Sequence, residues 1–410
     1  MKILLIHQAF VSPREAGGTR HYELAQHLIR NGHNFTIVAS DLSYLTGQRT
    51  IEGKGLVKEQ TIDGMRVLRA YTYPALHKSF VWRIISFLSF MLTSVWAAFR
   101  AGPVDLVIGT SPPIFQAFSA WVVAFLRRKP FLLEIRDLWP EFAIDMGVLK
   151  NPILIRLSRW LERFLYWRAT HIMVNSPAYR TYLTQKGVAE SKISLIPNGV
   201  DTRMFDPALD GSAIREELGL AGKFVITYAG ALGLANDLGL VLRAADGLRD
   251  DARIHFLLVG DGKERARLEE EAKKLALTNV TFAGSRPKTA IPSVLAASDA
   301  CLAILQDIPM FNTTYPNKVF DYMAAGRPTL LVIDGVIRDV VEAAEGGIFI
   351  PPGNAEALIE AARDLSQNPD RGRLMGQSAR AYVVEHFDRD QQAEQLTDLL
   401  RRMIQKQDRP

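Results

Sequence analysis

Short apolar runs alternate with longer stretches of helical period along the first half of the chain. Each run is continuous and is bounded by Gly, Pro, Asn or Asp, which is typical of strands buried on both faces of a sheet. Because strands and helices alternate at a length that suits right-handed crossover units, the pattern predicts a doubly wound parallel sheet. The predicted strands are Lys2–His7, Asn34–Ala39, Met65–Tyr71, Val104–Thr110, Phe131–Ile135, His171–Asn175 and Lys192–Ile196.

The same pattern restarts after a turn-rich stretch at residues 197–207, which indicates a boundary between two domains. The predicted strands of the second half are Lys223–Ala229, Ile254–Val259, Val280–Phe282, Ala300–Ile304, Thr329–Ile333 and Gly347–Ile350. Two amphipathic helices are expected last, over residues 354–382 and 390–405. The pattern therefore predicts an α/β protein with a first domain at 1–198, a second at 199–385 and a terminal helix within 386–410, with ligands bound at the carboxyl ends of the strands, in a cleft between the domains.

Composition narrows the class of protein. With 410 residues, 48% of them hydrophobic and 23% charged, the chain resembles ordinary two-domain globular proteins and not disordered or disulfide-rich ones. The lone cysteine, Cys301, lies in an apolar run, so we expect it to pack in the core. The apolar stretch at the N-terminus is too short for a signal peptide, which favours a cytoplasmic location.

The net charge of +5 conceals an asymmetry between the halves. Residues 1–200 carry 24 Lys and Arg against 13 Asp and Glu, whereas residues 201–410 carry 25 against 31. A basic first half indicates an anionic partner, either a nucleic acid or a phospholipid surface. Because the basic residues alternate with large apolar ones and no recognition motif is present, we expect the membrane surface and no nucleic acid.

Residues 80–99 are long and apolar enough to span a membrane, with Arg83 as the single charge. Three arrangements are open: a span, a helix buried in the domain, and a helix that docks in the plane of the membrane. A narrow, weakly polar stripe that includes Arg83, Ser86, Thr93 and Ala97 can lie against a sheet, and a span would separate strands that share one sheet. We favour in-plane docking near residues 80–100, helped by basic and aromatic residues within 154–168.

Two loops of the first half carry candidate chemistry. Gly17 and Gly18 precede a helix, where glycine permits close approach of the backbone to an anion, although an ordinary turn is an alternative. Arg136 and Asp137 follow a predicted strand that contains Glu134, at the edge where functional charges gather in such sheets. A simple ion pair between Arg136 and Asp137 is the alternative there.

The second half offers cations and one specific helix start. Lys263 and Arg286 each follow a strand beside glycine, as a diphosphate requires when no metal neutralises it. Asn317 and Lys318 open a predicted helix, and Asp321 lies one turn further on. A phosphate can bind the helix amides there while the carboxylate accepts hydrogen bonds from sugar hydroxyls.

The Asp388-Arg-Asp390 sequence imitates the Asp-x-Asp motif of metal-dependent transferases. It precedes a predicted helix and does not end an apolar strand, so helix capping explains it better. We therefore expect neither a metal nor a cofactor.

Over nearly its full length the chain resembles retaining glycosyltransferases of family 4. The resemblance rests on Gly17-Gly18 before a helix, the Ile-Pro-Asn-Gly-Val-Asp stretch 196–201, Tyr228-Ala-Gly230, Val-Gly-Asp-Gly at 259–262 and above all residues 318–328. The Arg-Asp-Leu-Trp-Pro stretch 136–140 is similar to that of a bacterial O-antigen and capsule subgroup that includes L-fucosamine transferases. This implies the GT-B architecture, in which a C-terminal helix crosses back to the first domain.

The resemblance also assigns roles by position. Asp321 ends the family's Glu-x7-Glu element and would contact the donor ribose, whereas the first Glu is replaced by Thr313. The family's basic pair falls near Ala231 and Asn236, neither of which is basic. Donor binding would then rest on Gly17, Gly18, Gly230, Lys263, Arg286, Asn317, Lys318 and Asp321. Asp137, Arg136 and Lys318 would act in catalysis, with Glu134 in reserve.

The implied function is transfer of an N-acetylated sugar from a UDP-sugar, without metal, to a polyprenyl-diphosphate-linked sugar in bacterial surface polysaccharide biosynthesis. The enzyme would lie on the inner face of the cytoplasmic membrane. Two alternatives share the fold: a soluble sugar transferase or phosphorylase, and a noncatalytic or impaired binding protein, which the departures at Ala231, Asn236 and Thr313 suggest.

Overall fold

The computed structural model describes residues 1–43, 46–75 and 80–407, which divide into two compact units. The first unit comprises Met1–Ser12, Thr19–Pro197 and Asp390–Pro410, and the second comprises Pro13–Gly18 and Asn198–Arg389. The chain passes between the units on either side of the short segment Pro13–Gly18, after Pro197 and again after Arg389. The expected terminal segment 386–410 is thus shared between the units, and its residues 408–410 lie outside the described part.

The first unit is built on an eight-stranded sheet in the order β3-β4-β2-β1-β5-β6-β7-β8. All neighbouring strands are parallel except the edge pair of β3 and β4. The strands are β1 (Lys2–Ile6), β2 (Asn34–Ser40), β3 (Val57–Ile62), β4 (Met65–Ala70), β5 (Leu106–Ser111), β6 (Phe131–Ile135), β7 (His171–Val174) and β8 (Ile193–Leu195). The helices are α1 (Arg20–Arg30), α2 (Phe80–Phe99), α3 (Ile114–Arg127), α4 (Glu141–Asp145), α5 (Pro152–Arg168), α6 (Pro177–Gln185) and α15 (Arg389–Gln407).

The second unit has a six-stranded parallel sheet in the order β11-β10-β9-β12-β13-β14. Its strands are β9 (Phe224–Ala229), β10 (Ile254–Val259), β11 (Val280–Gly284), β12 (Ala300–Ile304), β13 (Thr329–Val332) and β14 (Gly347–Phe349). Its helices are α7 (Ser212–Glu217), α8 (Leu238–Gly247), α9 (Arg265–Lys274), α10 (Ile291–Ala296), α11 (Asn317–Ala324), α12 (Val336–Ala343), α13 (Ala355–Gln367) and α14 (Pro369–His386). The prediction of two doubly wound domains is confirmed.

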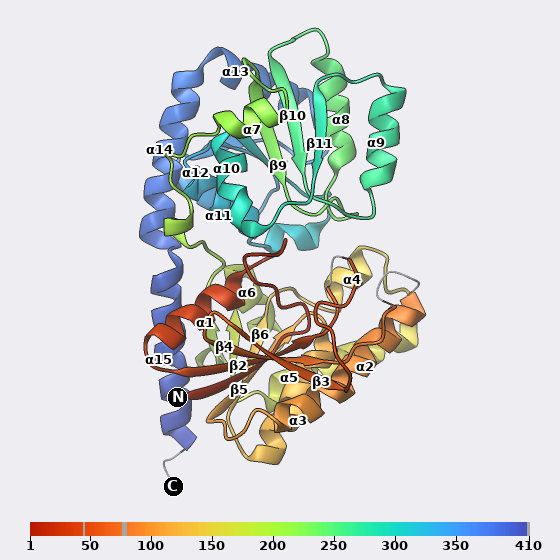
Figure 1. Ribbon diagram of the computed structural model, residues 1–410, viewed down its shortest axis with the longest axis vertical. Helices are drawn as coiled ribbons and strands as arrows, with labels where there is room; N and C mark the ends of the chain where they lie inside the picture. The colour runs from red at the N-terminus through yellow and green to blue at the C-terminus, as the bar shows by residue number, and fades with distance from the viewer. Residues whose placement is uncertain (44–45, 76–79, 408–410) are drawn as a thin grey trace. The chain divides into compact units, whose positions relative to one another are not determined.

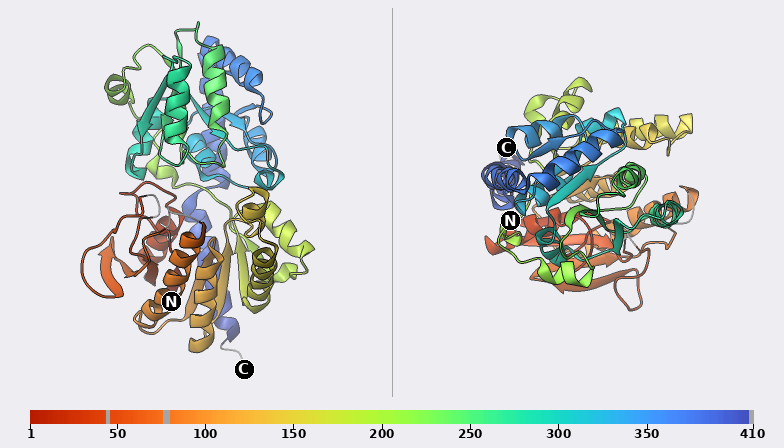
Figure 2. Two further views of the ribbon diagram at one scale, coloured as in Figure 1. Left: turned by 90° about the vertical axis from the view of Figure 1, so that its right-hand side faces the viewer. Right: turned by 90° about the horizontal axis from the view of Figure 1, so that it is seen from above.

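The last helix, α15, packs on the first unit although it follows the second unit in the chain. Its buried side chains Ala393, Leu396 and Leu400 join the same core as Leu24 and Leu28 of α1. Figures 1 and 2 show this blue helix alongside the strands of the first unit. The helix that crosses back to the first domain is therefore present.

Two predictions of local structure are wrong. The edge strand β3 was not expected, because its Lys, Glu, Gln and Thr residues lack an apolar run; the Asp63-Gly64 turn, with positive φ at both residues, was its sequence signal. The single helix expected over 354–382 is two helices. Pro369 opens α14 because it has no N–H with which to continue α13.

Helix α2 contacts the sheet through the stripe that the sequence predicts. Ser86, Phe90 and Ala97 are buried, and the Thr93 hydroxyl donates to the Tyr71 carbonyl oxygen at 2.7 Å. The window Trp82–Phe99 is long and apolar enough to cross a membrane, yet β4 and β5, which flank the helix in the chain, lie in one sheet. A span is incompatible with that sheet, and full burial is also wrong because Leu92 and Trp96 are exposed.

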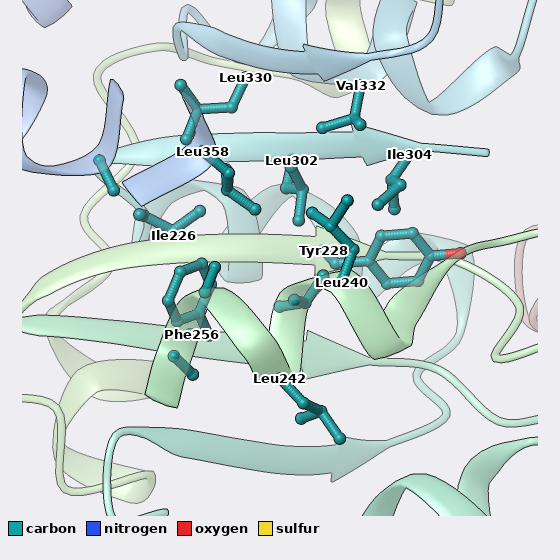
Figure 3. Packing of buried hydrophobic residues seen from close by; sticks show 14 of the residues in the cluster. Ile226, Tyr228, Leu240, Leu242, Phe256, Leu302, Ile304, Leu330, Val332 and Leu358 are labelled. Carbon is teal, nitrogen blue, oxygen red and sulfur yellow. The ribbon is translucent and has the colours of Figure 1, made fainter. Parts of the chain in front are cut away.

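One core of the second unit lies between one face of its sheet and helices α8 and α13, and another lies on the opposite face. Leu302 and Ile304 of β12 face Leu330 and Val332 of β13, with Leu240 and Leu358 packed against the strands (Figure 3). All six are buried within this cluster. Cys301, on the opposite face of β12, is buried as well, and burial raises the pKa of its thiol well above its ordinary range.

Leu302→Ala should lower the free energy of unfolding by about 3 kcal/mol, because it removes buried methyl groups from a core that can relax only in part. Urea denaturation followed by circular dichroism measures the change. The control is Leu374→Ala on α14, whose side chain is 66% exposed; it should change stability by less than about 0.5 kcal/mol. Equal effects of the two substitutions would contradict the packing described for β12.

Candidate active site

Helix α11 places three polar side chains at the edge of the second unit's sheet. Pro316 precedes its first residue, and Gly326, with a φ of +66°, follows its last turn. Val319, Phe320 and Met323 anchor the helix in the core. The remaining face begins with Asn317 and Lys318 and continues to Asp321, one turn later. Because the first N–H groups of a helix have no partner within it, this end favours an anion.

Lys318 is the best-defined candidate in the second unit. Its ammonium donates to the Tyr228 hydroxyl at 2.9 Å and to Asn236 Oδ1 at 3.2 Å, and it lies 4.1 Å from the centre of the Tyr228 ring. All these partners are uncharged. Burial therefore lowers the pKa of Lys318 to about 7. This lysine is a cation without a carboxylate among these partners, next to a helix N-terminus.

Glycine backbones leave room beside this ammonium. A Cβ on Gly230 would lie 3.1 Å from the Lys318 nitrogen, and a Cβ on Gly260 would lie 1.8 Å from the Gly230 carbonyl oxygen. Any larger residue at Gly260 would therefore displace the loop that follows β9. The glycines predicted from the sequence thus line the loop against which Lys318 packs.

Asp321 is paired with a residue that the sequence analysis missed. Its Oδ2 lies 2.5 Å from the ammonium of Lys288, whose side chain is almost buried and lies over the Phe205 ring. Lys288 follows β11 by four residues, close to the candidate Arg286. The sequence signal for Lys288 was a lysine soon after the carboxyl end of a strand. Arg286 was chosen instead because it lies closer to Gly284.

The remaining donor-site candidates divide into two groups. Gly17 and Gly18 are grouped with the second unit, where a Cβ on Gly18 would lie 3.7 Å from Asn317 Nδ2. Arg286, by contrast, forms an ion pair with Glu217, and Lys263 is exposed in the loop after β10. The structure therefore brings Gly18, Gly230 and the α11 residues together, while Arg286 is engaged elsewhere.

In the first unit, the carboxyl edge of the sheet holds a buried carboxylate at Glu134. Its two oxygens contact Arg20 Nε at 3.0 Å and His21 Nε2 at 2.5 Å, and the Arg20 guanidinium also donates to the Ile196 and Pro197 carbonyls. Burial opposes ionisation, but His21 and Arg20 together hold the pKa of Glu134 well below its ordinary range. Glu134 is therefore held as a carboxylate by these two partners.

Arg136 and Asp137 do not form the ion pair that was the alternative to function. Arg136 donates to Thr110 Oγ1 at 2.6 Å and to the Pro112 carbonyl at 2.9 Å. Asp137 is partly buried, and burial raises the pKa of its carboxyl to about 6 although the charge of Arg136 opposes the shift. A carboxylate that titrates near neutrality at this edge is a candidate for chemistry.

Metal ligation has no support in the described residues. Within 1–43, 46–75 and 80–407, no group of three or more His, Cys, Asp or Glu side chains is arranged to hold an ion. Asp388 accepts a hydrogen bond from the Thr202 hydroxyl at 2.6 Å, and Asp390 lies 3.1 Å from both His27 and Arg30. Both aspartates of the Asp-x-Asp imitation therefore have structural partners.

Comparison with known families agrees with this arrangement. Residues 16–199 match the family described as glycosyl transferase 4-like domain, and residues 211–382 match the family described as glycosyl transferases group 1. The chain is 25% identical to the "Putative colanic acid biosynthesis glycosyl transferase WcaI" of Escherichia coli K12, over 95% of this chain and 97% of that protein.

Solved structures show the same fold over the whole chain. Sucrose-phosphate synthase from Thermosynechococcus elongatus superimposes with a TM-score of 0.79 at 19% identity, covering 99% of each chain. Anabaena Alr3699/HepE, solved in complex with UDP-glucose, gives a TM-score of 0.73 at 18% identity, covering 98% of this chain and 99% of that one. With one family model on each half and full-length structural neighbours, the chain belongs to the glycosyltransferases of the two-domain GT-B fold.

Proposed function

We propose that this glycosyltransferase moves a sugar, N-acetylated by analogy with the subgroup, from a UDP-sugar to a polyprenyl-diphosphate-linked sugar, with retention of configuration. The Lys318 ammonium beside the α11 N-terminus is the single observation that carries the donor half of this proposal. The similarity to a colanic acid glycosyl transferase supports a role in bacterial surface polysaccharide biosynthesis. The neighbour solved with UDP-glucose supports uridine diphosphate as the nucleotide.

The donor diphosphate is the group that the second unit would hold. As the bond between the sugar and the β-phosphate oxygen breaks, negative charge develops on the departing UDP. Lys318 and the free amides of α11 are in place before that charge forms, so they stabilise it more than they stabilise the intact donor. Lys318 supplies the positive charge that Ala231 and Asn236 do not, because its ammonium lies against Asn236 Oδ1. No metal is required for this step.

The acceptor hydroxyl attacks the anomeric carbon from the face that the departing UDP occupies. Its oxygen forms the new glycosidic bond, and its proton passes to the β-phosphate oxygen of UDP, so configuration is retained. Positive charge develops on the sugar ring meanwhile. We assign to Asp137 the stabilisation of that charge, with Arg136 holding the loop through Thr110.

The first unit offers a surface for a lipid-linked acceptor. We define the docking face as the large, exposed apolar side chains of α2, α3 and α5, three helices that contact one another in sequence. Its residues are Trp82, Ile85, Leu88, Leu92, Trp96, Phe99, Phe125, Leu126, Ile153, Leu157, Trp160 and Trp167. Soluble surfaces rarely gather so many apolar side chains unless something covers them.

Charge supports an anionic bilayer as the occupant of the docking face. Arg128, Lys129, Arg156 and Arg163 are exposed on the same helices or at their ends. Basic residues near anionic lipid each contribute about 1 kcal/mol, in addition to apolar burial. An enzyme bound to the membrane surface would encounter a lipid-linked acceptor by diffusion within the plane of the same membrane. A soluble acceptor would give no reason for the apolar docking face. The enzyme would thus lie on the inner face of the cytoplasmic membrane.

The competing function is that of an inert binding protein, because Thr313 stands where the family has a glutamate. The Thr313 hydroxyl donates to the Met310 carbonyl at 2.6 Å. Slow release of UDP from a UDP-sugar by the wild-type chain separates the two. The donor panel is UDP-GlcNAc, UDP-FucNAc, UDP-Glc and GDP-mannose. Turnover of none of them would overturn the proposed function, and turnover of GDP-mannose alone would overturn the choice of nucleotide.

Lys318→Met should weaken UDP binding about tenfold or more, because it removes a charge-assisted contact to the diphosphate. The free energy of unfolding of the ligand-free protein should also change, but in its dependence on pH. The pKa of Lys318, about 7, lies below the ordinary lysine value of 10.5, so the unfolded state binds more protons between those values. Wild-type stability therefore rises with pH across that window, and the variant should lose the rise. Calorimetric titration and urea denaturation measure the two effects.

Lys274→Met is the control for Lys318, because Lys274 is an exposed lysine paired with Glu270 on α9. It should leave both UDP binding and the pH dependence unchanged. Unaltered UDP affinity in Lys318→Met, with the fold intact, would contradict the assignment of the donor diphosphate to α11.

Asp137→Asn should lower kcat about a hundredfold, because an amide cannot stabilise positive charge on the sugar as a carboxylate does. The wild-type rate should fall as the pH drops through about 6, where the Asp137 carboxyl takes up its proton. The variant should show no such inflection. A variant that keeps both the rate and the inflection would remove Asp137 from the mechanism.

Replacing Leu92 and Trp96 together by Asp should reduce binding to phosphatidylglycerol vesicles at least tenfold, because two large apolar side chains no longer enter the lipid. Vesicle sedimentation measures the bound fraction. Leu374→Asp, on an exposed site of the second unit, should bind as the wild type does. Wild-type protein that stays in the supernatant at low salt would exclude the docking face as a membrane surface.

A further inference from the structure

The sheet of the first unit changes direction between β1 and β5. From β1 the chain continues outward through β2 and β4, whereas β5 is followed on the other side by β6 and β7. The segments that follow β1 and β5, two paired parallel strands, therefore lead to opposite sides of this point. Open α/β sheets bind their ligands at such a point, outside the carboxyl ends of the strands. His7 and Gln8 follow β1 directly and stand at this point.

Both side chains are buried, and each has at least one nitrogen atom without a hydrogen-bond partner among the described residues. His7 is 2% exposed, and within the described residues neither of its ring nitrogens has a hydrogen-bond partner. Gln8 is 4% exposed, and its Nε2 likewise has none in the described part of the chain. Because an unpartnered buried polar group costs about 1 to 3 kcal/mol, two adjacent ones indicate a partner that comes from outside the chain.

The surrounding residues hold the His7 ring in place. The ring lies 4.3 Å from that of His21, centre to centre, and His21 is fixed in turn by Glu134 at 2.5 Å. Glu134 is itself held by Arg20. On the other side, the backbone N–H of Gln8 donates to Gln116 Oε1 of α3, which follows β5. The pair is therefore positioned by elements from both sides of the switch point.

The chemistry of the pair selects neutral hydroxyl groups. Burial, together with the charges of His21 and Arg136, lowers the pKa of His7 well below its ordinary value, so the ring is neutral. A neutral imidazole offers one donor and one acceptor, and the Gln8 amide adds donors. A sugar hydroxyl both donates and accepts, whereas a phosphate needs cations. The nearby cation Arg136 is bound to Thr110 and Pro112.

We propose that His7 and Gln8 form a hydroxyl-binding subsite that orients the acceptor sugar. This inference rests on the proposed function, because it names the place in the first unit that receives the acceptor. His7 and Gln8 would bind substrate directly, and His21, held by Glu134, would act as a positioning residue because its ring packs against that of His7. A site whose buried groups hydrogen-bond one particular hydroxyl of a substrate rejects an analogue that lacks this hydroxyl, because those groups are then left unpaired.

The first experiment follows the ring nitrogens of His7 in the full-length protein labelled with ¹⁵N-histidine. The probes are methyl α-D-glucoside, the methyl glycoside of N-acetylglucosamine, and UDP, and the His7 signals are assigned by their loss in His7→Asn. At least one glycoside should shift the His7 signals, while UDP should leave them in place. No response to either glycoside, or a response to UDP alone, would overturn the subsite.

The second experiment separates acceptor from donor in steady-state kinetics, with the most active donor of the panel and a polyprenyl-diphosphate-linked sugar as the acceptor. Gln8→Leu and His7→Phe should raise the acceptor KM about tenfold while UDP affinity and donor hydrolysis stay unchanged. His7→Asn, which keeps a donor and an acceptor, should recover part of the loss. The control His386→Phe alters an exposed histidine of α14. Unchanged acceptor KM in both variants would overturn the proposal.

Failure of this subsite and failure of the proposed function are distinguishable. If no nucleotide sugar is turned over, the proposed function fails, yet the glycoside titration still reports on His7. If donors are hydrolysed and neither glycoside shifts the His7 signals, the proposed function is retained and only the proposed subsite is rejected. A buried water that satisfies His7 would give that second pattern.

Discussion

A lysine ammonium withdrawn from water, with no carboxylate among its partners, is the constraint on which this account depends. Lys318 can sit there only because Tyr228 and Asn236 supply oxygen atoms and because Gly230 and Gly260 keep side chains out of the space beside it. Such an arrangement costs stability in the free protein and is repaid when an anion arrives. Under the proposed function, the glycines and the α11 N-terminus together with Lys318 would hold the donor diphosphate.

The helices of the first unit show how one sheet can serve two environments. Helix α2 turns Ser86 and Ala97 toward the sheet and Leu92 and Trp96 away from it, the reverse of an ordinary surface helix. On the buried side, Thr93 donates a hydrogen bond to the carbonyl of Tyr71, the residue that follows β4. The outer face is the one that we propose for lipid, and the same sheet carries polar residues such as Glu134 at its carboxyl edge.

Strands with continuous apolar runs, and the helix start at Asn317, were predictable because their signals are local. The edge strand β3 was not, since its polar residues are explained only by an antiparallel partner. Lys288 and His21 were missed for a related reason: their roles come from Asp321 and Glu134, which are far away in the sequence. Arg286 was predicted to bind the diphosphate because the sequence does not show that Glu217 lies beside it and forms an ion pair with it.

The most direct test is calorimetric titration of UDP into the full-length protein, once with EDTA and once with magnesium. Fixed positive groups in the second unit predict the same affinity in both solutions, since Lys318 and the α11 amides need no ion to bind the diphosphate. Binding that appears only when magnesium is present would contradict the central claim, because the charge of the nucleotide would then be balanced by a metal and not by the protein.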